Sequence, residues 1–320
     1  MRERRESMSE AKTVKQTFND TKRTARENSD TQRLFIYLGL TFVITFAWFF
    51  VANPDGSTWE DMGTMRQSFV ALGMMFPVIC HVLTRVITKE GFRFSGKENS
   101  YFGIVLKDGK WKYFLFACLV PWLYMELSNL IELAMCPAMY DPEYYVSLDV
   151  EKRILMLMPV YAIVTGTVGS FAAFGEEGGW RGYMMPKLLK ITGRKRALII
   201  GGVIWGLWHA PLTCIGHNFG TDYPGFPYLG IVCMCVFCTL MGVLLTFITE
   251  KSGSVWPAAI MHAVNNSNPT ILSGFINPDN KTTDLPTGMI AMCIALLVVV
   301  VPVMIIWSKS DKKTVSESHA

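Results

Sequence analysis

Charged residues are scarce in this sequence: Asp, Glu, Lys and Arg make up 18% of its 320 residues, whereas hydrophobic residues make up 51%. A typical soluble domain carries about 25% charged residues, so an ordinary soluble domain is excluded. The apolar residues come in blocks, and about 20 such residues can cross a bilayer as a helix. We count eight blocks: 34–52, 68–88, 112–134, 154–174, 197–217, 228–249, 254–275 and 289–307. The predicted fold is therefore all-α, a polytopic membrane helix bundle with about eight transmembrane helices.

Several familiar catalytic motifs are also missing. The sequence has no HExxH, which excludes the zincin arrangement of two histidines one turn apart. It has no GxSxG nucleophile elbow and no P-loop. Serine and cysteine side chains have no adjacent base that could activate them as nucleophiles. Seven of the eight cysteines lie within apolar segments, so we expect no disulfide framework.

The distribution of Lys and Arg predicts the orientation of the bundle. The N-terminal tail and the loops after the second and fourth segments are rich in both residues, whereas the alternate loops are poor. By the positive-inside rule both termini are cytoplasmic, as an even number of crossings requires. The net charge of +4 follows from this bias and indicates no nucleic-acid partner.

This pattern divides the chain into three parts. Residues 1–33 form a charged cytoplasmic tail, too long and too charged for the n-region of a signal peptide, so the first segment should remain as an uncleaved anchor. Residues 34–307 form one membrane domain, and 308–320 form a short cytoplasmic tail. We expect a multi-pass integral membrane protein in the cell membrane of a bacterium.

An acidic pair stands where the fourth apolar segment ends, in the stretch GEEGGWRGYMMPKL. A charge at that depth is costly unless it is paired or used, so Glu176, Glu177 and Arg181 are candidate site residues. On a helix Glu177 and Arg181 share a face and can form an ion pair. Glu176 is rotated away by about 100°, which leaves it available as a base that takes a proton from water. Alternatively, both acids simply anchor a helix end at the interface.

Two later apolar segments each carry a histidine. His209 follows Trp205 by one turn, and burying an imidazole in a membrane favours a function over a satisfied core histidine. His262 and Asn266 are four apart on one face, where they could donate two hydrogen bonds to an oxyanion. Alternatively, Asn266 binds a neighbouring helix as a polar contact. The direction of each segment predicts that Glu176 and both histidines meet in the cytosolic half of the bundle.

Other polar residues are weaker candidates. Asn265 and Asn268 lie on other faces of their helix, and Arg85 can extend its side chain to the interface. His81 shares its segment with Arg85, while Glu126 and Glu132 lie towards the outer side, away from the predicted centre; none is assigned a direct role.

At these residues the sequence resembles the CPBP family of intramembrane proteases, also called the CAAX-processing and bacteriocin-processing (Abi) family. That family has an acidic pair with an arginine, then a histidine preceded by an aromatic, then a histidine with Asn or Asp one turn later. The sequence supplies EEGGWR, WGLWH and HAVNN in this order, each on a separate apolar segment within the motif core 175–268. At Trp205 the family more often has Phe.

The resemblance implies an intramembrane endopeptidase acting on a membrane-associated protein or peptide, by CAAX-type or bacteriocin-type processing. Glu176 and His209 would activate a water, His262 and Asn266 would hold the oxyanion, and Glu177 and Arg181 would organise the site. Trp205 and Trp180 are candidates for the substrate pocket. A reaction without a metal is favoured, although Glu176, His209 and His262 could bind zinc.

Two other functions fit the same residues. The protein could be a non-catalytic immunity or scaffold protein of the same fold, or a proton-coupled transporter that uses the Glu/His cluster as a relay. Transport would predict inverted repeats or paired broken helices, which the sequence does not display.

Overall fold

The computed structural model describes residues 29–94, 96, 100–149, 151–268 and 270–318, of which most are helical. The only β pairing among these residues is an isolated bridge between Tyr140 and Ile276. The predicted all-α membrane bundle is confirmed. Most of the predicted tail 1–33 lies outside the described residues, and the first described helix is Ser29–Ala52.

Among the described residues, six helical stretches are long and apolar enough to cross a membrane. Two of them are composite: α2, a short 3-10 turn η1 and α3 follow one another without a break, and α7 continues through a π-helical turn η3 into α8. The six are Ser29–Ala52, α2 (Thr64–Ala71) to α3 (Phe76–Ile87) through η1 (Leu72–Met75), α4 (Trp111–Met135), α7 (Met158–Gly179) to α8 (Met185–Thr192) through η3 (Trp180–Met184), α11 (Tyr228–Ser252) and α13 (Thr287–Ser318).

The two remaining predicted segments are short helices, so the count of eight spanning helices is not confirmed. In place of 197–217 the structure has α9 (Arg194–Trp208) and the single turn α10 (Ala210–Thr213). In place of 254–275 it has α12 (Trp256–Asn266), which at 11 residues is about 16 Å long, roughly half the thickness of the hydrocarbon core. Every residue of α12 from 257 to 264 is buried, so its apolar sequence reflects protein neighbours on all sides rather than lipid.

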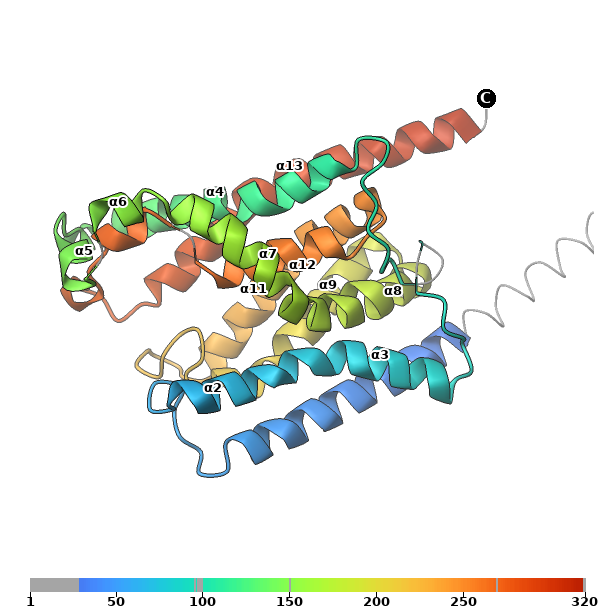
Figure 1. Ribbon diagram of the computed structural model, residues 1–320, viewed down its shortest axis with the longest axis horizontal. Coiled ribbons are helices and arrows are strands. Elements are labelled where there is room, and N and C mark those ends of the chain that lie inside the picture. Colours follow the sequence, from blue (N-terminus) through green and yellow to red (C-terminus); the bar gives the residue numbers. More distant parts are fainter. Residues whose placement is uncertain (1–28, 95, 97–99, 150, 269, 319–320) are drawn as a thin grey trace, which may run out of the picture.

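The helices run back and forth between two ends of the bundle (Figure 1). The start of the first described helix and the C-terminal end of α13 lie at the same end. The other end carries five short helices in its connections: η2 (Pro137–Met139), α5 (Tyr144–Ser147), α6 (Lys152–Leu155), η4 (Leu272–Phe275) and η5 (Pro278–Asn280). α12 packs against α7, α4 and α11, and with eight of its 11 residues buried it is the most enclosed of the longer described helices.

Small residues allow α9 to lie directly against α11. Gly202 and Gly206 are four apart on one face of α9, and a Cβ at Gly206 would lie 2.5 Å from the Cα of Cys235. Any larger side chain would force the two backbones apart, as in other small-xxx-small helix contacts. This contact fixes the position of α9, which carries Trp205 and leads into His209.

Candidate active site

The acidic pair lies inside the bundle, at the end of α7 where the π-helix begins. Glu176 and Glu177 are 2% and 0% exposed, and Arg181 is 3% exposed. Arg181 Nη1 lies 3.2 Å from Glu177 Oε2, so the ion pair expected from their spacing is confirmed. A buried guanidinium needs such a partner, because an unpaired charge costs several kcal/mol, on the order of 3–5, in a protein interior.

Glu177 has a second partner on α12. His262 Nδ1 lies 2.8 Å from Glu177 Oε1. Because a carboxylate oxygen can only accept, the hydrogen of this bond belongs to His262 Nδ1. Glu177 therefore joins Arg181 on its own helix to His262 on the most enclosed helix, which leaves the Nε2 atom of His262 for a ligand.

Trp205 is the residue that joins the acidic pair to both histidines. Its indole Nε1–H donates to Glu176 Oε2 at 2.8 Å, and its backbone carbonyl accepts from His209 Nδ1 at 2.9 Å. Its ring lies edge-on to that of His262, with centroids 5.5 Å apart. The structure thus brings residues from α7, α9 and α12 into one cluster, as the directions of the predicted segments required.

Trp205 also covers the arginine. The Arg181 guanidinium carbon lies 4.2 Å from the centroid of the Trp205 ring, an arrangement that stabilises a desolvated cation. In the sequence Trp205 was a candidate for the pocket wall only. Its contact with Glu176 was missed because helical spacing says nothing about which helices face each other.

Asn266 lies at the end of α12 and is exposed. Its Oδ1 accepts from Asn265 Nδ2 at 3.2 Å, and Asn265 Oδ1 accepts from the hydroxyl of Tyr124 at 2.6 Å. This chain of bonds leaves the Nδ2 group of Asn266 as a donor to a bound molecule. The sequence placed Asn265 on another face and gave no signal for Tyr124, one aromatic among many in an apolar segment.

Trp180, the other pocket candidate, is fully buried. Its ring lies edge-on to Tyr37 and to Trp208, with centroids 6.0 and 5.8 Å away. It packs in the main hydrophobic cluster and has no exposed face for a substrate.

The weaker candidates have structural partners. Glu126 accepts from the backbone N–H groups of Ile271 and Leu272 at 2.6 and 3.2 Å, at the start of η4. Glu132 accepts from the Thr287 hydroxyl at 2.8 Å, where α13 begins. Arg85, expected to extend to the interface, is 4% exposed, and its guanidinium donates to two backbone carbonyl groups of the loop that follows α3.

The side chains as placed do not fit a zinc ion. A protein zinc site gathers at least three His, Cys, Asp or Glu ligands, and no such group is found in the part of the chain that the structure describes. Independence from a metal stays a prediction, which metal analysis of the active protein can test.

Comparison with known proteins identifies the same part of the chain. Residues 158–268 match the family model for the type II CAAX prenyl endopeptidase, Rce1-like. This range extends from the start of α7 to just beyond α12 and includes every candidate site residue. A curated relative from Methanococcus maripaludis, CAAX prenyl protease 2, is 30% identical over 130 residues, or 40% of this chain and 46% of that protein. The chain thus spans about half the length of the curated relative it matches.

Proposed function

Because the chain belongs to the CPBP family of CAAX-processing intramembrane proteases, we propose that it is an endopeptidase that hydrolyses a peptide bond of a membrane-associated protein or peptide. The bond would be cut inside the bundle, at the cluster around Trp205, in the half nearer the cytoplasm. The protein is a multi-pass membrane protein, and we further propose that it resides in the cell membrane of a bacterium.

Glu176 is the proposed base. Trp205 holds its Oε2, and among the described residues its Oε1 accepts no hydrogen bond, so Oε1 can accept a proton from a water molecule. His209 Nδ1 donates to a backbone carbonyl, so in the neutral ring the lone pair is on Nε2 and can hold the same water. The resulting hydroxide attacks the carbonyl carbon of the scissile peptide bond, and Glu176 then delivers the proton to the leaving amine.

His262 and Asn266 are the proposed oxyanion donors. When His262 carries both ring protons, Nδ1–H binds Glu177 and Nε2–H can bind the oxygen that becomes negative. The Nδ2 group of Asn266 is one helical turn away on the same helix and can donate to the same oxygen. Glu177 and Arg181 would act indirectly, by fixing the position and the protonation of His262.

The observation that carries this proposal is the double role of Trp205. One residue binds the proposed base through its side chain and the proposed water-holding histidine through its backbone. A transporter or scaffold does not require an acid and two imidazoles to be fixed around one point, whereas hydrolysis does.

The substrate class that the relative's name suggests is a protein with a prenylated C-terminal tail. A cleavage assay tests both the reaction and this class, with purified protein and a peptide that ends in a farnesylated C-a-a-X sequence. The same peptide without the prenyl group serves as the comparison, and mass spectrometry locates the cut. We expect Glu176→Gln and His262→Ala to lower the rate by about 100- to 10,000-fold. Cleavage that survives both changes would contradict the site, and no cleavage of either peptide by the unchanged protein would favour a scaffold.

A further inference from the structure

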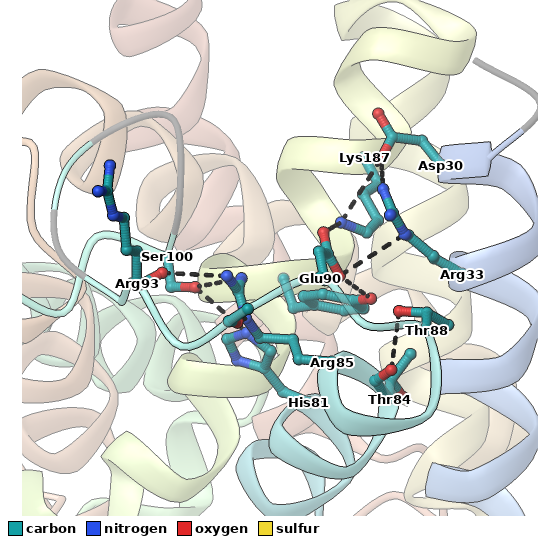
Figure 2. Close-up of polar contacts among 12 residues, drawn as sticks. Asp30, Arg33, His81, Thr84, Arg85, Thr88, Glu90, Arg93, Ser100 and Lys187 are labelled. Atoms are coloured by element: carbon teal, nitrogen blue, oxygen red, sulfur yellow. Dashed lines mark hydrogen bonds and ion pairs between the residues drawn. The ribbon is translucent and has the colours of Figure 1, made fainter. Parts of the chain in front are cut away.

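One buried histidine has no part in the reaction proposed above. His81 lies in α3, is 0% exposed and is surrounded by the rings of Phe94, Phe102 and Tyr183. Figure 2 shows His81 beside Arg85 of the same helix and Ser100 of the following loop. A polar ring enclosed by aromatic residues must have hydrogen-bond partners for both nitrogens, or it would be costly.

The partners of His81 form a chain of bonds with one possible direction. Arg85 Nη1 donates to Ser100 Oγ at 3.3 Å, because a guanidinium cannot accept. The hydroxyl hydrogen of Ser100 is therefore free to bind His81 Nε2, 3.2 Å away. With Nε2 accepting, the ring hydrogen is on Nδ1, which lies 2.9 Å from the backbone carbonyl oxygen of Gly178. All the polar groups in the chain are satisfied by neutral His81 in this one tautomer.

The carbonyl group of Gly178 lies between the acidic pair and the π-helix. It follows Glu177 directly and precedes the π-helix, Trp180–Met184, in which hydrogen bonds reach back five residues, as from Met185 N–H to Trp180 O. A backbone carbonyl oxygen has two lone pairs, so that of Gly178 can accept from a donor outside its own helix. His81 supplies that donor from α3.

The two helices also touch at this point. A Cβ at Gly179 would lie 2.5 Å from the backbone carbon of Pro77, and one at Gly178 would lie 2.8 Å from Val78 Cγ2. With no side chain between the backbones, the bond from His81 is a short and stiff link. The bond holds Gly178 in place, and Glu176 and Glu177 directly precede Gly178 in the same helix.

We propose that His81 is a positioning residue for the acidic pair, with Ser100 and Arg85 fixing its tautomer. The bond to the Gly178 carbonyl sets how far the end of α7 is rotated, and therefore where Glu176 meets Trp205 and Glu177 meets His262. Arg85 also donates to the carbonyl oxygens of Gly91 and Arg93, at 2.7 and 3.1 Å, so the same chain fastens the loop after α3 to the site. This inference depends on the proposed proteolysis for its catalytic consequence.

The cleavage assay distinguishes positioning from general packing. The amide nitrogen of Asn can take the place of Nδ1, whereas that of Gln takes the place of Nε2. We therefore expect His81→Asn to keep most of the activity, and His81→Gln and His81→Leu to lower kcat by up to about 100-fold with little change in KM. Ser100→Ala should have a smaller effect in the same direction. The matched control is Thr84→Val, which removes another fully buried hydrogen bond from α3, to Cys80 O, without reaching Gly178.

Equal losses in His81→Leu and Thr84→Val, or rescue by Gln as good as rescue by Asn, would overturn the proposal. A second measurement does not depend on the reaction. In thermal unfolding, the shifts in Tm caused by His81→Leu and Glu177→Gln should be non-additive, whereas those of Thr84→Val and Glu177→Gln should add. If the protein cleaves neither peptide, the proposed function fails, but the Tm measurements still test whether His81 is coupled to Glu177. Additive Tm shifts for both pairs of substitutions would overturn the proposed role of His81.

Discussion

The cluster around Trp205 has a closed half and an open half. In the closed half Glu177, Arg181 and His262 are at most 5% exposed and bind one another. In the open half His209 is partly exposed and Asn266 is exposed. The closed half can fix geometry but has little room for a ligand, whereas the open half can be reached by one. The difference separates residues that hold the site together from residues that can touch a substrate.

The largest expected effect is a loss of stability when Glu177, in the closed half, is replaced. Glu177→Ala leaves Arg181 buried without its carboxylate and removes the partner of His262, so we expect a loss of about 3–5 kcal/mol in the free energy of unfolding. Thermal or denaturant unfolding of the purified protein measures it. The control is Asp55→Ala, which breaks the exposed ion pair with Arg66 and should change stability far less. Equal losses of stability in Glu177→Ala and Asp55→Ala would mean that the Glu177 ion pair is no more shielded from solvent than an exposed one.

Trp205→Phe tests the link between the two halves. The ring and the backbone carbonyl remain, but the donor to Glu176 is lost, which for a bond to a charged group is worth about 1.5–3 kcal/mol. If that bond holds Glu176 in the reactive position, kcat should fall by about 10- to 100-fold. Trp208→Phe is the matched control, because Trp208 is a buried neighbour whose Nε1 has no hydrogen-bond partner in the described structure. Unchanged cleavage by Trp205→Phe would show that Glu176 needs no such support.

A smaller effect is expected in the open half. Tyr124→Phe removes the bond to Asn265, which in turn orients Asn266. A neutral hydrogen bond contributes about 0.5–1.5 kcal/mol, so the cleavage rate should fall by no more than about 10-fold. A loss larger than that of Trp205→Phe would reverse the contrast, because Asn266 would then be the more tightly positioned group.

The sequence predicted the helical class and the residues of the cluster, but not the lengths of the helices that carry the histidines. Hydropathy reports that a segment avoids water, and it cannot tell lipid from the interior of a bundle. α12 is short and wholly enclosed, whereas α13 is 32 residues long with many exposed apolar side chains, yet both looked like spanning segments. The ion pair of Glu177 and Arg181 could be predicted because it lies within one helix.

Contacts between helices could not be predicted in this way. The bonds from Trp205 to Glu176, from Tyr124 to Asn265 and from His81 to Gly178 each join residues at least 29 positions apart. Helical periodicity relates only residues within a few turns of each other. These three bonds depend on which helices are neighbours, and the spacing of residues along the chain does not reveal that.

The smallest expected effect concerns Glu90, a carboxylate with several partners at the end of the bundle where the first described helix begins and α13 ends (Figure 1). Glu90 accepts from Lys187 Nζ at 2.7 Å and from the Tyr183 hydroxyl at 2.8 Å, and Arg33 Nε lies 3.9 Å away (Figure 2). Burial favours the neutral acid, but the bond and the charge of Lys187 outweigh it and lower the pKa of Glu90 below its ordinary value. The neighbouring Asp30, 3.7 Å from Lys187, shares the same cation.

A pKa that is lower in the folded than in the unfolded protein means that stability decreases as the pH falls. The stabilisation by ionised Glu90 is complete above the pKa of an unfolded glutamate, about 4.3, and is lost as the pH falls through the lower, folded pKa. The difference in Tm between the unchanged protein and Glu90→Gln should therefore be constant near neutral pH and shrink below about pH 4. Thermal unfolding of both proteins across this range measures the difference, in which the other carboxylates cancel. A difference that stayed constant down to pH 3 would mean that ionised Glu90, unlike Glu177, adds no stability through its contacts with Lys187 and Arg33.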